Sequence, residues 1–276
     1  MPISWFPGHM NKAEKELRKL IKSSDLIIEL LDARAPSASR NPLLATIGKE
    51  LPRIFILNKL DLGDPAISRK WEIYFQKYTS AKCLLNSIYR PVSIDKLRSL
   101  ARSLIKEKNS PYKSLQFIII GIPNVGKSSF INSLCKRKIT KTGNEPAVTK
   151  AQQRIKFDKD IFLVDTPGLL WPKLEDQDAA NKLGALGSIK HTAIDLEDVA
   201  WFIAEYLLSE QLTALQSRYS FKGIITADKL FNLIAEVTGC LTKGGDLNYH
   251  KVAETLLNDL RSGKLGAISL EAPPRP

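Results

Sequence analysis

The stretch from Gly121 to Ser128 reads GIPNVGKS and fits the phosphate-binding pattern G-x-x-x-x-G-K-[ST]. The apolar run LQFIII at residues 115–120 precedes it and is typical of a buried strand, and residues 128–135 have the pattern of a helix start. In the order strand, glycine-rich turn and helix, backbone N–H groups and the positive end of the helix dipole converge on one point. The sequence therefore predicts a binding site for a phosphate chain at this turn.

The residues of this turn have separate expected roles. Gly121 and Gly126 let the backbone come close to the phosphates because they carry no side chain. Lys127 is expected to reach the terminal phosphates, and the hydroxyl of Ser128 is expected to ligate Mg²⁺. The alternative is a glycine-rich turn that fits the pattern by chance, and the strand before it favours the phosphate site.

The composition is that of an ordinary folded protein, with 43% hydrophobic and 25% charged residues. No apolar run is long enough to span a membrane, and basic residues interrupt residues 12–22 where a secretory signal would have its apolar core. The three cysteines, Cys83, Cys135 and Cys240, are widely spaced and read as reduced thiols. We therefore expect a cytoplasmic protein. The start at WFPGHM, without an Arg/Ser-rich leader, favours the bacterial cytosol over an imported precursor.

The net charge is +12, and the excess of basic residues lies within the first 178 residues. A basic balance of this size suggests a polyanionic partner, with RNA as the leading candidate. The alternative is a basic surface that serves only solubility, and the charge alone does not decide between the two.

Short strands alternate with helices along the first 165 residues. Strands of the buried type are predicted at residues 26–31, 53–57, 83–85 and 115–120, and helices at 11–21, 41–48, 66–78 and 94–108. This alternation predicts an α/β fold with a mostly parallel sheet and helices on both faces. Ligands in such sheets bind at the carboxyl ends of the strands, and polar motifs follow those ends here.

One of these motifs, Asn58-Lys59-Leu60-Asp61, matches N-K-x-D, the guanine reader of GTPases. Guanine presents two donors on one edge, N1–H and the 2-amino group, and the Asp61 carboxylate could accept both. Adenine would leave that carboxylate unpaired, at a cost of roughly 1–3 kcal/mol or more. Asn58 is expected to tie the base to the phosphate loop, and the stem of Lys59 to cover the ring. Asn86-Ser87, after the next strand, fits more loosely the loop whose backbone N–H contacts the guanine oxygen.

A basic loop and a pair of strands follow the phosphate-binding turn. Residues 139–150 predict a loop, and Thr149 is either the residue that closes on Mg²⁺ and the γ-phosphate or an ordinary loop threonine. Residues 152–157 and 161–164 predict an antiparallel pair, which ends in the sequence DTPG at residues 165–168. There Asp165 would hold the water shell of Mg²⁺, and the N–H of Gly168 would sense the γ-phosphate.

These parts look like those of the translation-factor-related P-loop GTPases in a rotated order, with the guanine reader first, then the phosphate loop and DTPG. This order resembles that of the circularly permuted GTPases. With WFPGHM at residues 5–10 and DARAP at residues 32–36, the whole chain resembles the ribosome biogenesis GTPase A family, and GKLG at residues 263–266 is similar to that family's tail. The resemblance implies GTP as substrate, GDP as product and a role late in assembly of the large (50S) ribosomal subunit.

Site residues are carried over only where this chain matches the family pattern. Lys127 and Thr149 are expected to act in catalysis, and Mg²⁺ is expected on Ser128, on Thr149 and, through water, on Asp165. The expected nucleotide contacts are Asn58, Lys59, Leu60, Asp61, Asn86, Ser87, Asn124, Val125, Gly126, Lys127, Ser128, Ser129, Thr149 and Gly168.

Two positions bear on the mechanism. Leu169 stands where Ras-like enzymes carry the glutamine that positions the attacking water, and a leucine cannot do so. We hypothesise that His9, brought in from the amino-terminal loop, or a group of the ribosome takes this role; His9 as a structural loop residue is the alternative. Related potassium-activated GTPases hold K⁺ with an asparagine at the position of Asn124, where the alternative is a hydrogen bond within the loop backbone.

From residue 179 onward the apolar spacing is helical throughout, with helices predicted at 179–186, 198–208, 211–218, 227–238 and 249–260. Gly239 and Gly263 fit helix ends. We expect a circularly permuted GTPase domain at residues 1–175 and a helical domain at 176–276. The aromatic residues of the second domain read as core, and TKGG at residues 242–245 as an exposed basic turn and a possible RNA contact.

Two functions remain open on the sequence. The first is a Mg²⁺-dependent GTPase, stimulated by K⁺ and by the ribosome, that acts on the precursor of the large subunit through ribosomal RNA and ribosomal proteins. The second is a regulatory GTP switch or RNA-binding protein that acts through a non-ribosomal partner. In either case we expect a monomer that does not bind a membrane.

Overall fold

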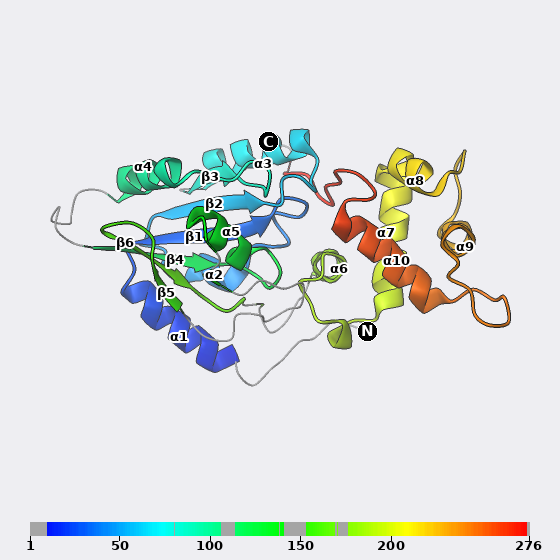
Figure 1. Ribbon diagram of the computed structural model, residues 1–276, viewed down its shortest axis with the longest axis horizontal. Helices are drawn as coiled ribbons and strands as arrows, with labels where there is room; N and C mark the ends of the chain where they lie inside the picture. The colour runs from blue at the N-terminus through cyan, green and yellow to red at the C-terminus, as the bar shows by residue number, and fades with distance from the viewer. Residues whose placement is uncertain are drawn as a thin grey trace.

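The computed structural model describes residues 10–79, 81–105, 114–137, 139–140, 153–168, 170 and 176–274. Within this part, a six-stranded sheet has the order β3-β2-β1-β4-β6-β5 (Figure 1). All strands run parallel except β5, which pairs antiparallel with β6. The mostly parallel α/β fold is as predicted. The strands are β1 (Leu26–Asp32), β2 (Arg53–Asn58), β3 (Lys82–Leu85), β4 (Leu115–Ile120), β5 (Gln153–Lys156) and β6 (Ile161–Asp165).

The strand register places the polar ends of the strands along one edge of the sheet. Every residue of β1 is buried, as its apolar run LIIELL predicts for a central parallel strand. Asp32 at the end of β1 lies opposite Asn58 at the end of β2, and Asp165 at the end of β6 lies opposite Ile119 of β4. The motifs that follow these strands therefore start from neighbouring positions.

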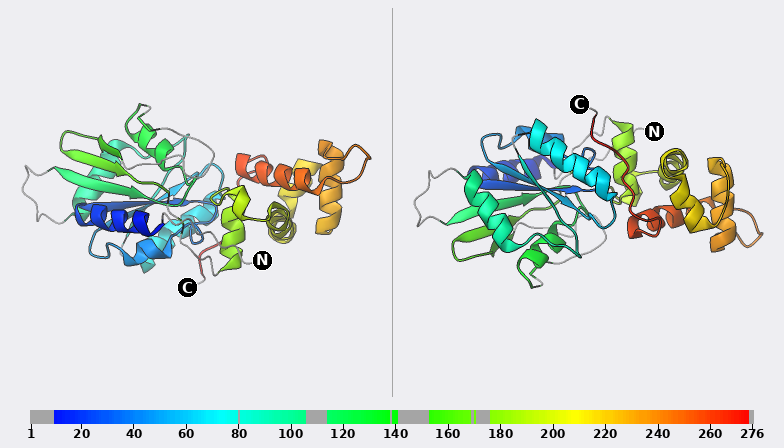
Figure 2. Two further views of the ribbon diagram at one scale, coloured as in Figure 1. Left: turned by 90° about the horizontal axis from the view of Figure 1, so that it is seen from below. Right: turned by 90° about the horizontal axis from the view of Figure 1, so that it is seen from above.

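Helices cover both faces of the sheet (Figures 1 and 2). The residues of β1 and β2 that face one side pack with α1 (Met10–Lys22), α2 (Pro42–Thr46) and α3 (Pro65–Tyr78). Those that face the other side pack with α4 (Ile94–Leu104) and α5 (Lys127–Leu134). Trp71 and Phe75 of α3 anchor the first side, with their rings stacked at 5.2 Å between centroids. This double covering leaves the carboxyl edge of the sheet to the loops.

The chain after residue 176 is helical, as predicted. It forms α6 (Gln177–Ala185), α7 (Leu196–Glu210), α8 (Leu212–Tyr219), α9 (Ala227–Thr238) and α10 (Tyr249–Ser262), with a short 3₁₀ turn at His191–Ala193. Gly239 and Gly263 end α9 and α10 with φ of 70° and 76°, the left-handed conformation that favours glycine. After α10 the chain runs back along the sheet-containing part and ends beside α3 (Figure 2).

Several smaller predictions can also be compared with the structure. The helix predicted at residues 94–108 ends at Leu104, and residues 106–113 lie outside the described part. Cys83 and Cys240 are buried, and burial raises the pKa of the Cys83 thiol. The turn at residues 242–245 is exposed, as expected, and one isolated bridge between Leu241 and Leu247 closes it. None of the described helices is long and apolar enough to cross a bilayer.

Candidate functional site

The glycine-rich loop leads directly from β4 into α5. Gly126 is the residue before α5 and has a φ of 97°. A Cβ atom on Gly126 would lie 2.3 Å from Nδ2 of Asn58, and one on Gly121 would lie 2.7 Å from the carbonyl oxygen of Leu30. Both positions therefore need glycine, because the neighbouring strands bring other atoms close to the loop.

Lys127, the first residue of α5, is buried with its ammonium turned back over this loop. Its Nζ donates hydrogen bonds to the carbonyl oxygens of Gly121, at 3.0 Å, and Ile122, at 2.8 Å. Burial lowers the pKa of Lys127 to about 8, although the nearby Asp165 carboxylate acts in the opposite direction. The ammonium and the positive end of the α5 dipole thus lie at the same loop. Together they would stabilise a phosphate group bound there.

Two buried asparagines join the phosphate loop to the proposed base-reading segments. Nδ2 of Asn58 donates to the carbonyl oxygen of Val125 at 2.8 Å, and Nδ2 of Asn86 donates to Oδ1 of Asn58 at 2.7 Å. Oδ1 of Asn86 in turn accepts from the backbone N–H of Val92 at 2.8 Å. Three loops that are far apart in the sequence are thus held together by hydrogen bonds between side chains and backbone, which we call the asparagine bridge (Asn58, Asn86 and Val125).

The segment expected to read the base, residues 58–61, is called the base-reading segment below. Its backbone has a positive φ at its second residue and is fixed by hydrogen bonds. Lys59 adopts a φ of 60°, and its Nζ lies 3.0 Å from Oδ2 of Asp32. The N–H of Leu60 donates to the carbonyl oxygen of Asn86 at 3.1 Å. Asp61, the residue expected to read guanine, is partly exposed beside this framework. A partly exposed carboxylate in this position is accessible to a ligand, and it follows a backbone that the bond from Leu60 fixes.

The loop after β3 uses its backbone N–H groups within the protein. The N–H of Asn86 donates to the carbonyl oxygen of Leu57 at 2.9 Å, and the N–H of Ser87 donates to the carbonyl oxygen of Arg90 at 3.3 Å. Both groups are therefore engaged within the protein, so their contact with a guanine oxygen stays a prediction. The contribution that the structure does give Asn86 is its side chain, which fixes Asn58.

Asp165 is fully buried at the end of β6. Neither of its carboxylate oxygens has a hydrogen-bond partner among the described residues. Burial raises the pKa of Asp165 to about 6, although the Lys127 ammonium and the nearby backbone N–H of Thr166 favour the charged form. An unpartnered buried carboxylate is costly, and a hard cation such as Mg²⁺ would satisfy it. The geometry therefore fits the expected Mg²⁺ site.

Gly168 completes this side of the site. A Cβ atom there would lie 2.7 Å from Cα of Pro123 and 3.1 Å from Nζ of Lys127, so the DTPG segment lies directly against the phosphate loop. Ser128 is partly buried and Ser129 is exposed at the start of α5. His9, Thr149 and Leu169 lie outside the described residues.

Asn124 does not bond only within its own loop. Its Nδ2 donates to the carbonyl oxygen of Gly187, in the turn after α6, at 2.7 Å. The side-chain oxygen is the atom that would ligate K⁺, because cations of this kind bind oxygen ligands. The bond to Gly187 links the phosphate loop to the helical part of the chain.

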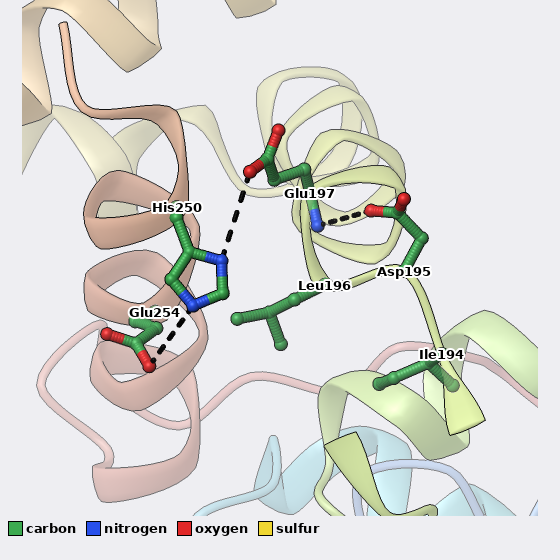
Figure 3. Close-up of a pocket in the computed structure, with 6 residues that line it drawn as sticks. All are labelled: Ile194, Asp195, Leu196, Glu197, His250 and Glu254. Carbon is green, nitrogen blue, oxygen red and sulfur yellow. Dashed lines mark hydrogen bonds and ion pairs between the residues drawn. The ribbon is translucent and has the colours of Figure 1, made fainter. Parts of the chain in front are cut away.

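An open hollow of about 300 Å³ lies apart from this edge of the sheet, between the starts of α7 and α10 (Figure 3). His250 lies there between two carboxylates, with Nδ1 3.9 Å from Oε1 of Glu197 and Nε2 3.7 Å from Oε1 of Glu254. Asp195 adds a third carboxylate, so the hollow would repel a phosphate chain. This feature does not compete as a nucleotide site.

Known proteins are similar to this chain over nearly its whole length. Residues 116–235 match the family model described as 50S ribosome-binding GTPase. The chain is 41% identical to ribosome biogenesis GTPase A of Bacillus licheniformis, over 99% of both sequences. It belongs to the ribosome biogenesis GTPase A family. The chain is therefore a GTP-binding and GTP-hydrolysing enzyme with the motifs of a circularly permuted GTPase.

More distant members of the ribosome biogenesis GTPase A family agree with this assignment. The Thermotoga maritima member is 28% identical over 98% of this chain and 96% of its own. The solved structure of GNP-bound YlqF from T. maritima superimposes with a TM-score of 0.68 at 23% identity, over 95% of this chain and 98% of the other. The fold is thus shared over 95% of this chain.

Sequence reasoning missed two kinds of residue in this family member. The first is Thr140, whose Oγ1 donates to the carbonyl oxygen of Ser128 at 3.0 Å and ties the loop after α5 to the helix start. No pattern in the sequence indicates that contact. The second is Asp32, the partner of Lys59. It is the first residue of DARAP, and its place at the end of a predicted buried strand is a signal that could have found it.

Proposed function

We propose that this enzyme binds GTP across the carboxyl edge of the sheet and hydrolyses it during late assembly of the large ribosomal subunit. The asparagine bridge is the observation that carries the proposal, because it holds the base-reading segment at Asp61 and the phosphate loop at fixed positions relative to each other. A guanine nucleotide has its base and phosphates at opposite ends, so it needs both parts fixed together.

In this proposal each residue has one task. Asp61 accepts from N1–H and the 2-amino group of guanine, and Lys127 exchanges its two carbonyl partners for oxygens of the terminal phosphates. Ser128 and Thr149 would hold Mg²⁺, and Asp165 would do so through water. When bound there, the ion would neutralise negative charge on the phosphates. The N–H of Gly168 reports the γ-phosphate, and His9 or a ribosomal group orients the water.

The division of labour follows the two parts of the chain. We assign nucleotide chemistry to residues 1–175 and docking on the particle to residues 176–276, with ribosomal RNA and ribosomal proteins as partners and a cytoplasmic monomer as the acting form. Docking through the helical part rests on the family resemblance and not on its charge, because the basic excess that suits RNA lies within the first 178 residues. The relatives are named for ribosome biogenesis, which supports the particle as partner.

We expect slow hydrolysis by the free enzyme and faster hydrolysis on the particle, because Leu169 cannot position water. GTP turnover with and without purified large subunits checks this, together with co-sedimentation at increasing salt in GTP or a non-hydrolysable analogue. If His9 orients the water, His9→Ala will bind GTP normally and lose the stimulation; full stimulation would exclude that role. Absence of nucleotide-dependent association, with tight binding to another protein, would instead favour the regulatory switch.

Hydrolysis should be faster in KCl than in NaCl at equal ionic strength, by about tenfold or more, because a cation held by Asn124 adds positive charge beside the transition state. Steady-state GTP turnover in the two salts measures the ratio. The variant Asn124→Ala should bring the ratio close to one. Equal rates of the unaltered enzyme in the two salts would contradict the K⁺ site.

A further inference from the structure

Two motifs have no part in the nucleotide chemistry described above. They are DARAP at residues 32–36 and GKLG at residues 263–266, which are separated by more than two hundred residues of sequence. In the structure the segment that begins with the second motif runs past the first, beside the segment expected to read the base. The contacts between them run through the segment 263–271, which we call the carboxyl-terminal strap.

The DARAP side of this contact is a buried cluster of charges. Asp32 is 1% exposed, and its carboxylate accepts two hydrogen bonds from Arg34, from Nε at 2.9 Å and from Nη2 at 2.8 Å. Oδ2 of the same carboxylate lies 3.0 Å from Nζ of Lys59. Burial raises the pKa of Asp32, but the charges of Arg34 and Lys59 outweigh it and hold that pKa well below its usual range. Asp32 is therefore anionic and fixes the second residue of the guanine reader.

The strap bonds to the backbone on both sides of that cluster. The N–H of Ile268 donates to the carbonyl oxygen of Leu62 at 2.9 Å, and the N–H of Leu270 donates to the carbonyl oxygen of Arg34 at 2.7 Å. Oγ of Ser269 accepts from the N–H of Asp64 at 3.1 Å. Residues 62 and 64 lie within three positions after Asp61. The bonds from the strap therefore fix the backbone just after the base-reading segment, as the bonds of Asn58 fix its start.

Side chains hold the strap in this place. Leu265, Ile268 and Leu270 are 4%, 2% and 1% exposed, which is the burial of core residues rather than of a loose tail. At the end of the strap, the carbonyl oxygen of Glu271 accepts from Nε1 of Trp71 in α3 at 3.2 Å. The strap is therefore anchored beyond the base-reading segment as well as on it.

We propose that Asp32, Arg34 and the carboxyl-terminal strap are positioning elements of the guanine site, and that guanine binding and strap docking stabilise each other. The inference rests on the proposed placement of guanine at Asp61. None of these groups needs to touch the nucleotide, because they act through Lys59 and the backbone of residues 62–64. Coupling of this kind is reciprocal, so a ligand that orders the base-reading segment must also tighten the strap.

Hydrogen exchange of the full chain, with and without GDP or ADP, tests the coupling in one direction. GDP should slow exchange of the Ile268 and Leu270 amides at least about fivefold, and ADP should not. The amide of Ile234 in α9 serves as the reference. Calorimetry on the same sample separates two failures: no binding of GDP would refute the nucleotide site itself, whereas binding without slower exchange would refute the coupling alone.

Substitution tests the other direction. Leu270→Ala should weaken GDP binding at least about fivefold and should lower the preference for GDP over IDP, which lacks the 2-amino group that Asp61 reads. Ala267→Ser, at an exposed strap position, should preserve both values. If Leu270→Ala does not fold, Ser269→Ala is measured instead. A lower melting temperature with an unchanged GDP/IDP ratio would mean that the strap serves stability only.

Discussion

Asp61→Asn should exchange the enzyme's preference for guanine for a preference for xanthine. The carboxylate of Asp61 can accept from both N1–H and the 2-amino group of guanine, whereas an asparagine offers one acceptor and one donor. Xanthine keeps N1–H and carries a carbonyl at C2, so the asparagine amide complements it. We expect GDP affinity to fall by about 100-fold or more and XDP affinity to rise, measured by calorimetry with both nucleotides.

Asp64→Asn is the matched control for this change. Asp64 also lies in the loop after β2, where its side chain accepts from the N–H groups of Ala66 and Ile67 and caps α3. Asparagine caps a helix about as well as aspartate, so this variant should keep the fold and the preference for GDP. Equal losses of GDP affinity in both variants, or no gain of XDP binding by the first, would show that Asp61 is not the base reader.

Local sequence patterns were sufficient to predict the strands and the motifs at their ends. The apolar run at residues 26–31 predicts a central strand because both of its faces must be buried, and Asn58 was expected to join the base to the phosphate loop. Its bond to Val125 supplies the contact with the phosphate loop, and its contact with a base stays a prediction. Each of these inferences needs only neighbouring residues and the rule that parallel strands end at one edge.

Contacts between distant segments could not be predicted in this way. The bond from Asn124 to Gly187 and that from Leu270 to Arg34 each depend on how the helical part packs on the sheet. No periodicity relates such residues, since one partner is a backbone carbonyl that any residue could supply. The sequence also could not show that Asn86 contributes its side chain, because the base-loop pattern refers only to its backbone.

Asp165→Asn should have two opposite effects, a loss of hydrolysis and a gain in stability. Hydrolysis should fall by about 100-fold or more, because the carboxylate that we propose to hold Mg²⁺ is lost. The free energy of unfolding of the protein freed of nucleotide and Mg²⁺ should instead rise at pH 7.5. In that protein the ionised carboxylate is buried, and neither oxygen meets the geometry of a hydrogen bond with a described residue; asparagine removes its charge.

The pH dependence gives this prediction its sign. The pKa of Asp165 is raised in the folded protein from 3.8 to about 6, so folding favours the protonated form. The contribution of Asp165 to the stability of the unaltered enzyme therefore falls as pH rises from about 4 to 6 and stays lower above, by about 2–3 kcal/mol. Asp165→Asn lacks this loss, so its advantage in thermal unfolding should be small at pH 4.5 and large at pH 7.5.

Asp246→Asn removes an exposed carboxylate in the turn after α9 and should give no such pH-dependent gain. The competing effect is the attraction between Asp165 and the ammonium of Lys127, whose own pKa burial lowers to about 8. If that attraction outweighs the cost of burial, Asp165→Asn will be less stable than the unaltered enzyme at pH 7.5. The melting temperature of Asp165→Asn minus that of the unaltered enzyme at pH 7.5 therefore decides between the two. A positive difference means that the buried carboxylate is destabilising without a bound cation, and a negative one means that the lysine already stabilises it.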